Sequence, residues 1–293
     1  METPKINPHG AVILAVISIS TSAIFVKLSA AEAGVIAFYR MLFSILIMAP
    51  VFFPKYTKEL KGISKKDWLY SALAGIFLSF HFILWFESLE YTSVASSTVL
   101  VTLQPLFAFF GAFIFFKERF SFKAIASAGI AVIGSIIISW GDFHISGSAL
   151  FGDMLALAAC ALITAYLLIG QMIRQRLSLM TYTFFVYLFS AFVLLVYVFM
   201  TQGQLYPYPP SEWIYFLSLA ILPNLLGHSV FNWALKWIST TVISMAILFE
   251  PVGATILAYI FLGEKVYLTQ IAGGMIIIFG VSLFIRKEKE DDL

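Results

Sequence analysis

The chain is a succession of long apolar stretches separated by short polar segments. Each stretch has about the 20 residues that an α-helix needs to cross a lipid bilayer. The apolar runs are continuous rather than alternating, which favours helices over the strands of a membrane barrel. The predicted spans cover residues 10–29, 34–53, 68–88, 93–116, 121–140, 149–170, 180–200, 212–235, 240–262 and 267–285. We therefore expect an all-α membrane protein with ten transmembrane helices. The first run is longer than the apolar core of a signal peptide, so it is expected to be retained.

The segment around Pro251 repeats an earlier segment around Pro105. An offset of 146 residues pairs these two prolines and also pairs Glu118 with Glu264. At this offset, 12 of the 61 positions of residues 79–139 carry the same residue in the later segment. Self-similarity at a fixed period is the signature of a repeated structural unit. The matched proline, glutamate and glycine positions carry this interpretation, because matches between apolar residues are frequent by chance in so apolar a chain.

Each copy of the unit holds five predicted spans. An odd number of spans makes the second copy enter the membrane in the opposite direction. We therefore predict two inverted-topology repeats, at residues 1–140 and 149–286, with a charged cytoplasmic tail at 287–293. Inverted repeats are characteristic of secondary transporters, whose substrate site lies near the midplane of the membrane between the repeats.

Composition agrees with a lipid environment. Of the residues, 61% are hydrophobic and 12% are charged, whereas soluble domains carry about 25% charged residues. The formal net charge of +2 indicates no nucleic-acid partner. A single cysteine, Cys160, excludes an intramolecular disulfide. Its apolar surroundings favour a small buried side chain.

The positions of the basic residues predict the orientation in the membrane. With ten spans, most of the 18 basic residues collect on the side that holds both termini. They are Lys5, Lys55, Lys58, Lys61, Lys65, Lys66, Lys117, Arg119, Lys123, Arg174, Arg176, Lys236, Arg286, Lys287 and Lys289. Lys265 falls on the other side, while Lys27 and Arg40 lie within spans. Because cytoplasmic loops carry the excess of Lys and Arg, we predict a multi-pass cell-membrane protein with both termini in the cytoplasm.

Two charged residues lie inside predicted spans at positions that need a physical reason. Inserting an Arg such as Arg40 at a helix centre costs roughly 3 kcal/mol. It is either an anchor for a carboxylate or another anion, or a structural residue that snorkels or forms an ion pair. Glu250 is either a proton-coupling group or partner for a substrate amine, or a hydrogen-bonded structural residue. Its counterpart in the first copy is Gln104. Pro105 and Pro251 follow these two positions and are candidate hinges, because proline removes a helical hydrogen bond.

Further polar and aromatic residues form stripes on predicted helix faces. Asn224, His228 and Asn232 follow one another at intervals of four residues, as do His81 and Trp85. Tyr187 belongs to a polar face of the seventh span. Such side chains either line a substrate path or bridge helices through hydrogen bonds. We expect the substrate to contact Arg40, His81, Trp85, Gln104, Tyr187, Asn224, His228, Asn232 and Glu250.

Several segments together resemble the EamA-like branch of the drug/metabolite transporter superfamily. The residues that carry the resemblance are Lys27, Tyr39–Arg40, Trp85–Phe86, Leu89–Ser96, Pro105–Glu118, Glu250–Glu264, Gln270, Gly273 and Gly280. The resemblance implies a basket-like bundle with a central cavity formed by spans 1–4 and 6–9. Spans 5 and 10 then lie outside the cavity, where their glycines offer a packing or dimer face. The second half departs from the first by having Val186 opposite Arg40, which leaves open which half holds the substrate charge.

These observations predict a secondary transporter that works by alternating access and exports amino acids or related metabolites, as members of this branch do. One alternative is an uptake or exchange carrier for metabolites or drugs on the same fold. Alternatives from other classes are an intramembrane enzyme and a scaffold that has lost transport. No His-Glu-x-x-His or Gly-x-Ser-x-Gly motif is present, which argues against an enzyme. The expected partners are the lipid bilayer, the small-molecule substrate, protons and a second copy of the chain, with no cofactor and no metal.

Overall fold

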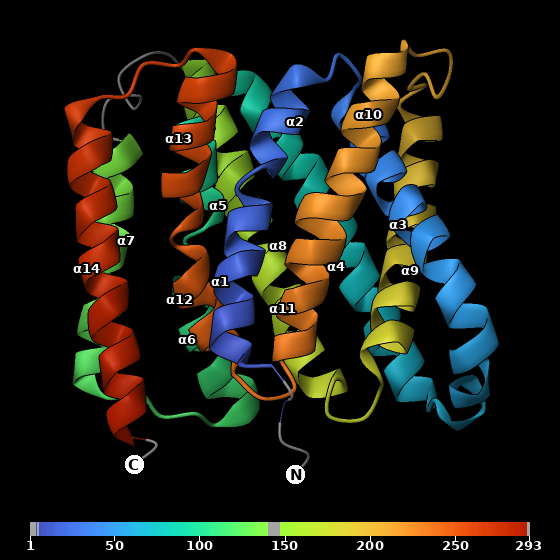
Figure 1. Ribbon diagram of the computed structural model, residues 1–293, viewed down its shortest axis with the longest axis horizontal. Helices are drawn as coiled ribbons and strands as arrows, with labels where there is room; N and C mark the ends of the chain where they lie inside the picture. Colours follow the sequence, from blue (N-terminus) through green and yellow to red (C-terminus); the bar gives the residue numbers. More distant parts are fainter. Residues whose placement is uncertain (1–3, 5, 140–146, 292–293) are drawn as a thin grey trace.

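The computed structural model describes residues 4, 6–139 and 147–291, and every regular element in this part of the chain is a helix (Figure 1). Most of the predicted linker and the last two residues of the tail lie outside the described residues. The first half contains α1 (Pro8–Ile19), α2 (Ser22–Leu28), α3 (Ala33–Tyr56), the 3-10 helix η1 (Thr57–Gly62), α4 (Lys65–Tyr91), α5 (Val94–Val101), α6 (Gln104–Phe116) and α7 (Phe122–Ser139). The second half contains α8 (Gly147–Ile173), α9 (Leu179–Met200), α10 (Pro210–Leu219), the π-helix η2 (Ala220–His228), α11 (Ser229–Ala234), α12 (Thr240–Ile247), α13 (Glu250–Leu262) and α14 (Leu268–Asp291).

Eight helical stretches among the described residues are long and apolar enough to cross a membrane. Two shorter apolar helices, Phe122–Ile138 and Leu268–Phe284, occupy the positions of the fifth and tenth predicted spans. The prediction of an all-α membrane protein is confirmed. α1 begins and α14 ends at the same face of the molecule (Figure 1).

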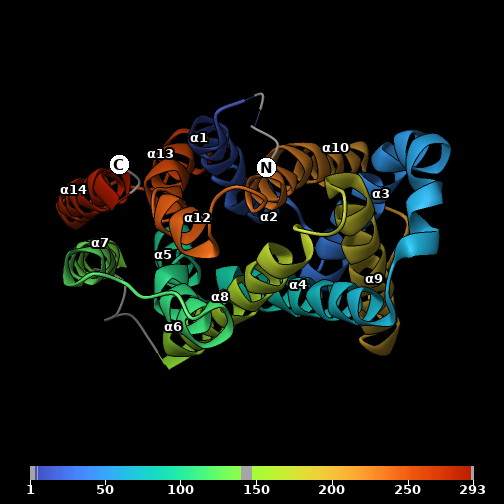
Figure 2. The ribbon, with the colours of Figure 1, turned by 90° about the horizontal axis from the view of Figure 1, so that it is seen from below.

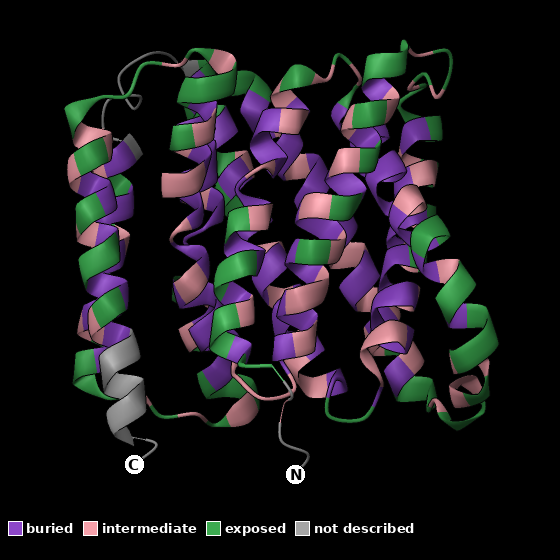
Figure 3. Ribbon diagram, viewed as in Figure 1, coloured by how far each residue is buried: buried purple, intermediate pink, exposed green. Residues whose placement is uncertain are grey.

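Exposed residues lie on the outer faces of the helices and buried residues where the helices meet (Figure 3). The exposed set is rich in large apolar side chains, and the buried set includes polar ones. Phe110 and Phe192 are two-thirds exposed on the outer surface, with 67% and 66% of their area accessible. Arg40, Asn224 and Asn232, in contrast, are fully buried. Exposed apolar side chains of this number are unfavourable in water, so the outer surface is suited to lipid. In a membrane protein, polar residues turn towards the protein interior, as they do here.

Two of the predicted spans are broken near the middle. The fourth span stops after Val101 and resumes at Gln104, and the ninth stops after Ile247 and resumes at Glu250. Pro105 and Pro251 are therefore not kinks within helices but occupy the first turn of α6 and α13. Proline is favoured there because the missing N–H has no partner in a first turn anyway. The first span is also broken, between α1 and α2, which the apolar pattern did not predict.

The ends of α6 and α13 repeat the same local geometry 146 residues apart. Lys117 and Gly263 end these helices in the left-handed region, at φ 59° and φ 69°. The amide after each donates to the carbonyl six residues earlier, at 3.3 Å in both copies. α5 to α6 and α12 to α13 run in opposite directions through the molecule (Figure 1).

The eighth predicted span contains a π-helical segment that changes the expected face. The amide of Ser229 donates to the carbonyl of Asn224, five residues back rather than four. A π-turn is wider than an α-turn and frequently marks a functional site. Asn224, His228 and Asn232 therefore do not share one face, although their spacing predicts it for a regular α-helix.

α7 and α14 pack side by side at one end of the molecule, outside the main bundle (Figure 2). A side chain at Gly134 would place its Cβ 2.7 Å from the carbonyl oxygen of Gly273. A Cβ at Gly280 would lie 2.7 Å from the amide nitrogen of Ala131. Gly134, Gly273 and Gly280 thus allow close approach within the chain, between α7 and α14.

Candidate functional site: a central polar pocket

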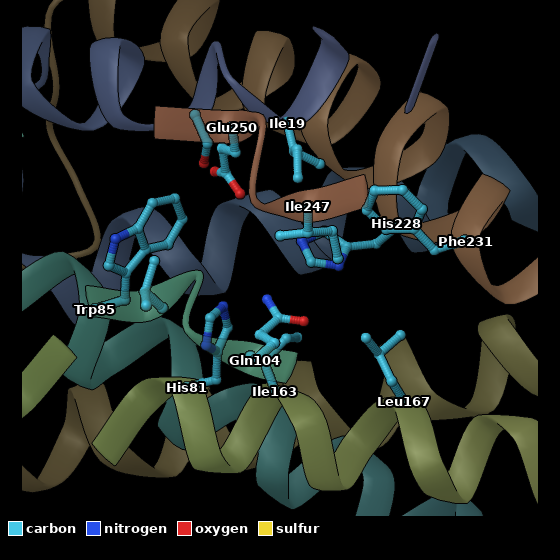
Figure 4. Close-up of a pocket in the computed structure, with 12 residues that line it drawn as sticks. Ile19, His81, Trp85, Gln104, Ile163, Leu167, His228, Phe231, Ile247 and Glu250 are labelled. Carbon is cyan, nitrogen blue, oxygen red and sulfur yellow. The ribbon is translucent and has the colours of Figure 1, made fainter. Parts of the chain in front are cut away.

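A small pocket lies in the middle of the bundle, where the broken helices meet (Figure 4). Its lining includes five of the residues predicted to contact the substrate, namely His81, Trp85, Gln104, His228 and Glu250. The cavity has a volume of about 20 Å³, which accommodates water rather than a metabolite. A substrate therefore needs the walls of the pocket to move apart.

The helix breaks place two of these residues at equivalent positions. Gln104 is the first residue of α6 and Glu250 the first residue of α13. His81 and Trp85 lie one turn apart on α4, and their rings are 5.8 Å apart in a stacked arrangement. His228, the last residue of η2, places its ring 6.5 Å from that of His81. The two histidines thus face each other, although their sequence positions do not match at the repeat offset.

The pocket has a polar end and an apolar end. Trp85 and Glu250 lie towards one end, and Leu167 and Phe231 towards the other (Figure 4). Several polar atoms near it are buried without a hydrogen-bond partner among the described residues, including Trp85 Nε1, Gln104 Oε1 and His228 Nδ1. Buried polar atoms normally have partners, so these groups are candidates for contacts with a ligand.

Arg40 lies directly behind the pocket wall. It is fully buried on α3, and its Nη1 donates to Ser22 Oγ at 2.9 Å. Ser22 itself lines the pocket. The guanidinium carbon lies 4.1 Å from the centre of the Phe82 ring, a cation–π contact. Within the described residues Arg40 has no salt bridge, and its Nε and Nη2 have no hydrogen-bond partner. Arg40 therefore neither snorkels to the surface nor forms an ion pair.

Tyr187 and Asn224 belong to a buried hydrogen-bond network next to Arg40 rather than to the pocket lining. Asn224 Nδ2 donates to Ser44 Oγ at 2.7 Å, and Ser44 Oγ donates to the carbonyl of Arg40 at 2.8 Å. The Tyr187 hydroxyl is 2.9 Å from Ser229 Oγ. This network links α3, α9, η2 and α11, so it fixes the position of Arg40 relative to the second half.

Asn232 also lies outside the pocket lining and bridges helices. Its Nδ2 donates to the Tyr166 hydroxyl and, at 2.9 Å, to the carbonyl of His228. The backbone carbonyl of Asn232 accepts a hydrogen bond from Arg174 Nε at 2.8 Å. Four of the predicted residues therefore lie outside the pocket lining: Arg40, Tyr187, Asn224 and Asn232. Direct contact between the substrate and any of them stays a prediction.

The sequence interpretation missed Ser22 and Phe82, which hold the Arg40 side chain. A signal for Ser22 exists in the run Ser-Ile-Ser-Thr-Ser at residues 18–22, which interrupts an apolar stretch and marks the break between α1 and α2. Nothing in the sequence distinguishes Phe82 from the other phenylalanines. Among the residues that the structure describes, no group of three or more His, Cys, Asp or Glu side chains could hold a metal ion.

Membrane-length helices around a buried polar pocket suit a membrane transporter of small molecules, and the similarity to known proteins supports this class. The chain belongs to the EamA-like transporter family, whose model matches residues 9–140 and again residues 150–286. This family is a branch of the drug/metabolite transporter superfamily, and its members are transporters rather than enzymes.

Similar proteins span nearly the same length. An uncharacterized transporter of Archaeoglobus fulgidus is 26% identical over 279 residues, covering 92% of this chain and 94% of the relative. The uncharacterized transporter YxxF of Bacillus subtilis is 27% identical over 228 residues, covering 77% and 72%. The riboflavin transporter ImpX of Fusobacterium nucleatum is 21% identical over 259 residues, covering 84% and 86%. A solved crystal structure superposes with a TM-score of 0.77 at 17% identity, covering 98% of this chain and 99% of the other, which shows a shared fold.

Proposed function

We propose that this protein is a secondary transporter that exports amino acids or related small metabolites across the cell membrane by alternating access. The observation that carries the proposal is the presence of two ionisable groups of opposite type, a carboxyl group in the pocket lining and a guanidinium behind it. Glu250 lines the pocket, and Arg40 lies behind Ser22 with two nitrogens that have no partner among the described residues. A zwitterionic amino acid carries an ammonium group and a carboxylate. The carboxylate of Glu250 can bind the ammonium group, and the guanidinium of Arg40 can bind the carboxylate.

The opposite end of the pocket is suited to an apolar side chain. Leu167 and Phe231 line it and offer hydrocarbon surface without a charged group (Figure 4). Ligand sites typically combine such apolar walls with a few placed polar groups that fix orientation. An amino acid with an aliphatic or aromatic side chain fits this division, with its charged groups at the Glu250 end.

The fold supports alternating access between the two sides of the membrane. We place both termini in the cytoplasm and treat residues 1–140 and 149–286 as inverted repeats. α6 and α13 begin beside the pocket and run in opposite directions away from it (Figure 1). Rocking of one repeat against the other about the breaks before Pro105 and Pro251 enlarges the pocket towards one side at a time.

Transport in proteoliposomes tests the substrate class. Efflux of radiolabelled apolar amino acids is expected from vesicles that contain the wild-type protein. Arg40→Gln and Glu250→Gln are each expected to lower this flux at least about tenfold, because each removes a charge-assisted contact. Arg176→Gln is the matched control: the Arg176 side chain is half-exposed, forms a salt bridge to Asp67 at 2.7 Å and lies outside the pocket lining. No flux of any amino acid would remove this substrate class but not the assignment as a transporter.

Proton coupling through Glu250 is a separate part of the proposal. The side chain is buried at the pocket, where a carboxylate can gain and lose a proton as the site opens to either side. Glu250→Gln is expected to abolish the dependence of flux on a pH gradient. If flux in the variant keeps both its size and its pH dependence, Glu250 is not the coupling group.

A second candidate is a carrier for a planar heteroaromatic metabolite. The stacked rings of His81 and Trp85, together with His228, give the pocket three flat aromatic groups. This observation, and the similarity to a transporter named for riboflavin, favours testing riboflavin uptake in the same vesicles. Riboflavin flux that amino acids do not inhibit would favour this candidate over amino-acid export.

A further inference from the structure

A second concave surface, separate from the polar pocket, lies between α6 and α7 on the outside of the bundle. It is a groove of about 780 Å³, lined by Leu106, Phe109, Phe110 and Phe113 of α6 and by Ile125 and Gly129 of α7. The one charged residue that lines it is Arg119, in the connection between the two helices. Phe110 and Phe113 are 67% and 58% exposed, so the groove opens to the surroundings of the protein.

The groove has the length of one leaflet of the bilayer. It runs from Pro105, next to the central pocket, to Arg119 beyond the far end of α6. The 13 residues of α6 span about 20 Å at 1.5 Å per residue, while half of a hydrocarbon core is about 15 Å. An acyl chain that enters beside Arg119 therefore reaches the middle of the membrane along the phenylalanine face of α6.

Arg119 supplies a charge at the end where a lipid headgroup lies. Its side chain is exposed and has no hydrogen bond or salt bridge to another residue that the structure describes. Lys117 and Lys123, in the same connection and at the start of α7, are exposed as well. A guanidinium pairs with phosphate oxygens through two parallel hydrogen bonds. Basic sites at the edge of membrane helices are where anionic headgroups bind.

One of the residues that line the groove is small in the first repeat and large in the second. A Cβ built at Gly129 meets no atom within 4 Å, so the groove is open at this point. At the repeat offset of 146 residues, Gly129 corresponds to Met275 and Arg119 to Lys265. The two repeats thus share the basic charge at this position but differ in the size of the side chain that borders the groove.

We propose that the α6–α7 groove binds one anionic phospholipid, with an acyl chain along α6 and the phosphate on Arg119. Native mass spectrometry of the purified full-length protein tests this, by titration with phosphatidylglycerol and, separately, phosphatidylcholine. Wild-type protein is expected to bind phosphatidylglycerol more tightly than phosphatidylcholine. Arg119→Gln should weaken phosphatidylglycerol binding about tenfold and remove the preference.

Two further variants separate this site from general lipid contact. Lys123→Gln is the matched control, because it removes a basic residue of the same region that does not line the groove. It should keep the preference for phosphatidylglycerol. Gly129→Met, the residue of the second repeat, should weaken binding of both lipids without lowering the temperature of unfolding.

Three results would overturn the proposal. The first is equal binding of the two lipids by the wild-type protein. The second is an equal effect of Arg119→Gln and Lys123→Gln, which would assign the preference to the charge of the whole loop. The third is a shift from dimer to monomer in Gly129→Met with unchanged lipid binding, which would make the groove an interface between two copies of the chain.

Discussion

Arg40 is the residue whose surroundings are least explained by stability. The fully buried guanidinium makes one hydrogen bond, to Ser22, and contacts the rings of Phe82 and Phe86. Two of its nitrogens have no hydrogen-bond partner among the described residues. Burying such a charge without a partner destabilises the folded protein by roughly several kcal/mol, even after local relaxation. An anionic ligand group supplies the missing acceptors, so the unfavourable free-state arrangement is consistent with a binding role.

Arg40→Met separates binding from structure at this position. Replacing an unpaired buried charge by an apolar side chain of similar length is expected to leave the free energy of unfolding unchanged or to raise it by about 1–4 kcal/mol. Transport is expected to be lost at the same time. Thermal unfolding in detergent and flux in vesicles measure the two effects. A variant that fails to fold, while Arg40→Lys folds normally, would show that Arg40 has a structural role instead.

Discontinuous helices are the elements that give this fold its site. α5 and α6, like α12 and α13, divide one span into two short helices, and each second helix begins beside the pocket. The breaks bring Gln104 and Glu250 to helix starts, where backbone groups are not fully used by the helix. η2 adds a wider turn that directs His228 into the pocket while Asn224 turns to Ser44. Irregular backbone at membrane depth is tolerated where it lines a cavity or is buried in protein.

The matched ends of α6 and α13 give a test at the level of one element. Lys117 adopts a left-handed conformation that glycine adopts without steric cost, and its counterpart is Gly263. Lys117→Gly is therefore expected to raise the free energy of unfolding by about 1 kcal/mol, and Gly263→Ala to lower it by about 1 kcal/mol. Thermal unfolding measures both, with Gly62→Ala as a control at a glycine without a positive φ. Equal effects of the two glycine-to-alanine variants would contradict this explanation.

In the molecule as a whole, the central pocket lies between the two halves of the chain. Each half contributes pocket residues, such as His81 and Gln104 from the first and His228 and Glu250 from the second. α7 and α14 pack on each other beside the bundle and contribute none of the lining (Figure 2). A transporter built in this way can open to one side by moving the halves relative to each other.

The orientation of the halves can be measured with single cysteines. Cys160 is the single cysteine of the chain, so Cys160→Ala gives a background without thiols. In it, Lys117→Cys is expected to react with an impermeant reagent from the cytoplasmic side, and Lys265→Cys from the outside. Both lysines are exposed and lie in corresponding loops of the two repeats. Labelling of both from the same side would exclude inverted repeats.

The class of fold, the repeat and the main chemical groups of the site follow from the amino-acid sequence alone. Apolar runs of bilayer length leave the chain few alternatives to helices, because unpaired backbone groups are too unfavourable in lipid. The offset of 146 residues pairs Gln104 with Glu250 without any knowledge of their contacts. The rarity of charged residues within spans is enough to single out Arg40.

Which of these groups share a pocket, in contrast, depends on tertiary packing. Regular helical spacing places Asn224, His228 and Asn232 on one face, but the π-turn separates them, and a change of hydrogen-bond register depends on packing that a sequence pattern does not contain. The facing of His81 and His228, and the place of Arg40 behind Ser22, likewise depend on how distant helices meet. Periodicity reports the direction of a side chain from its own helix, whereas the contact it makes is set by the helix on the other side.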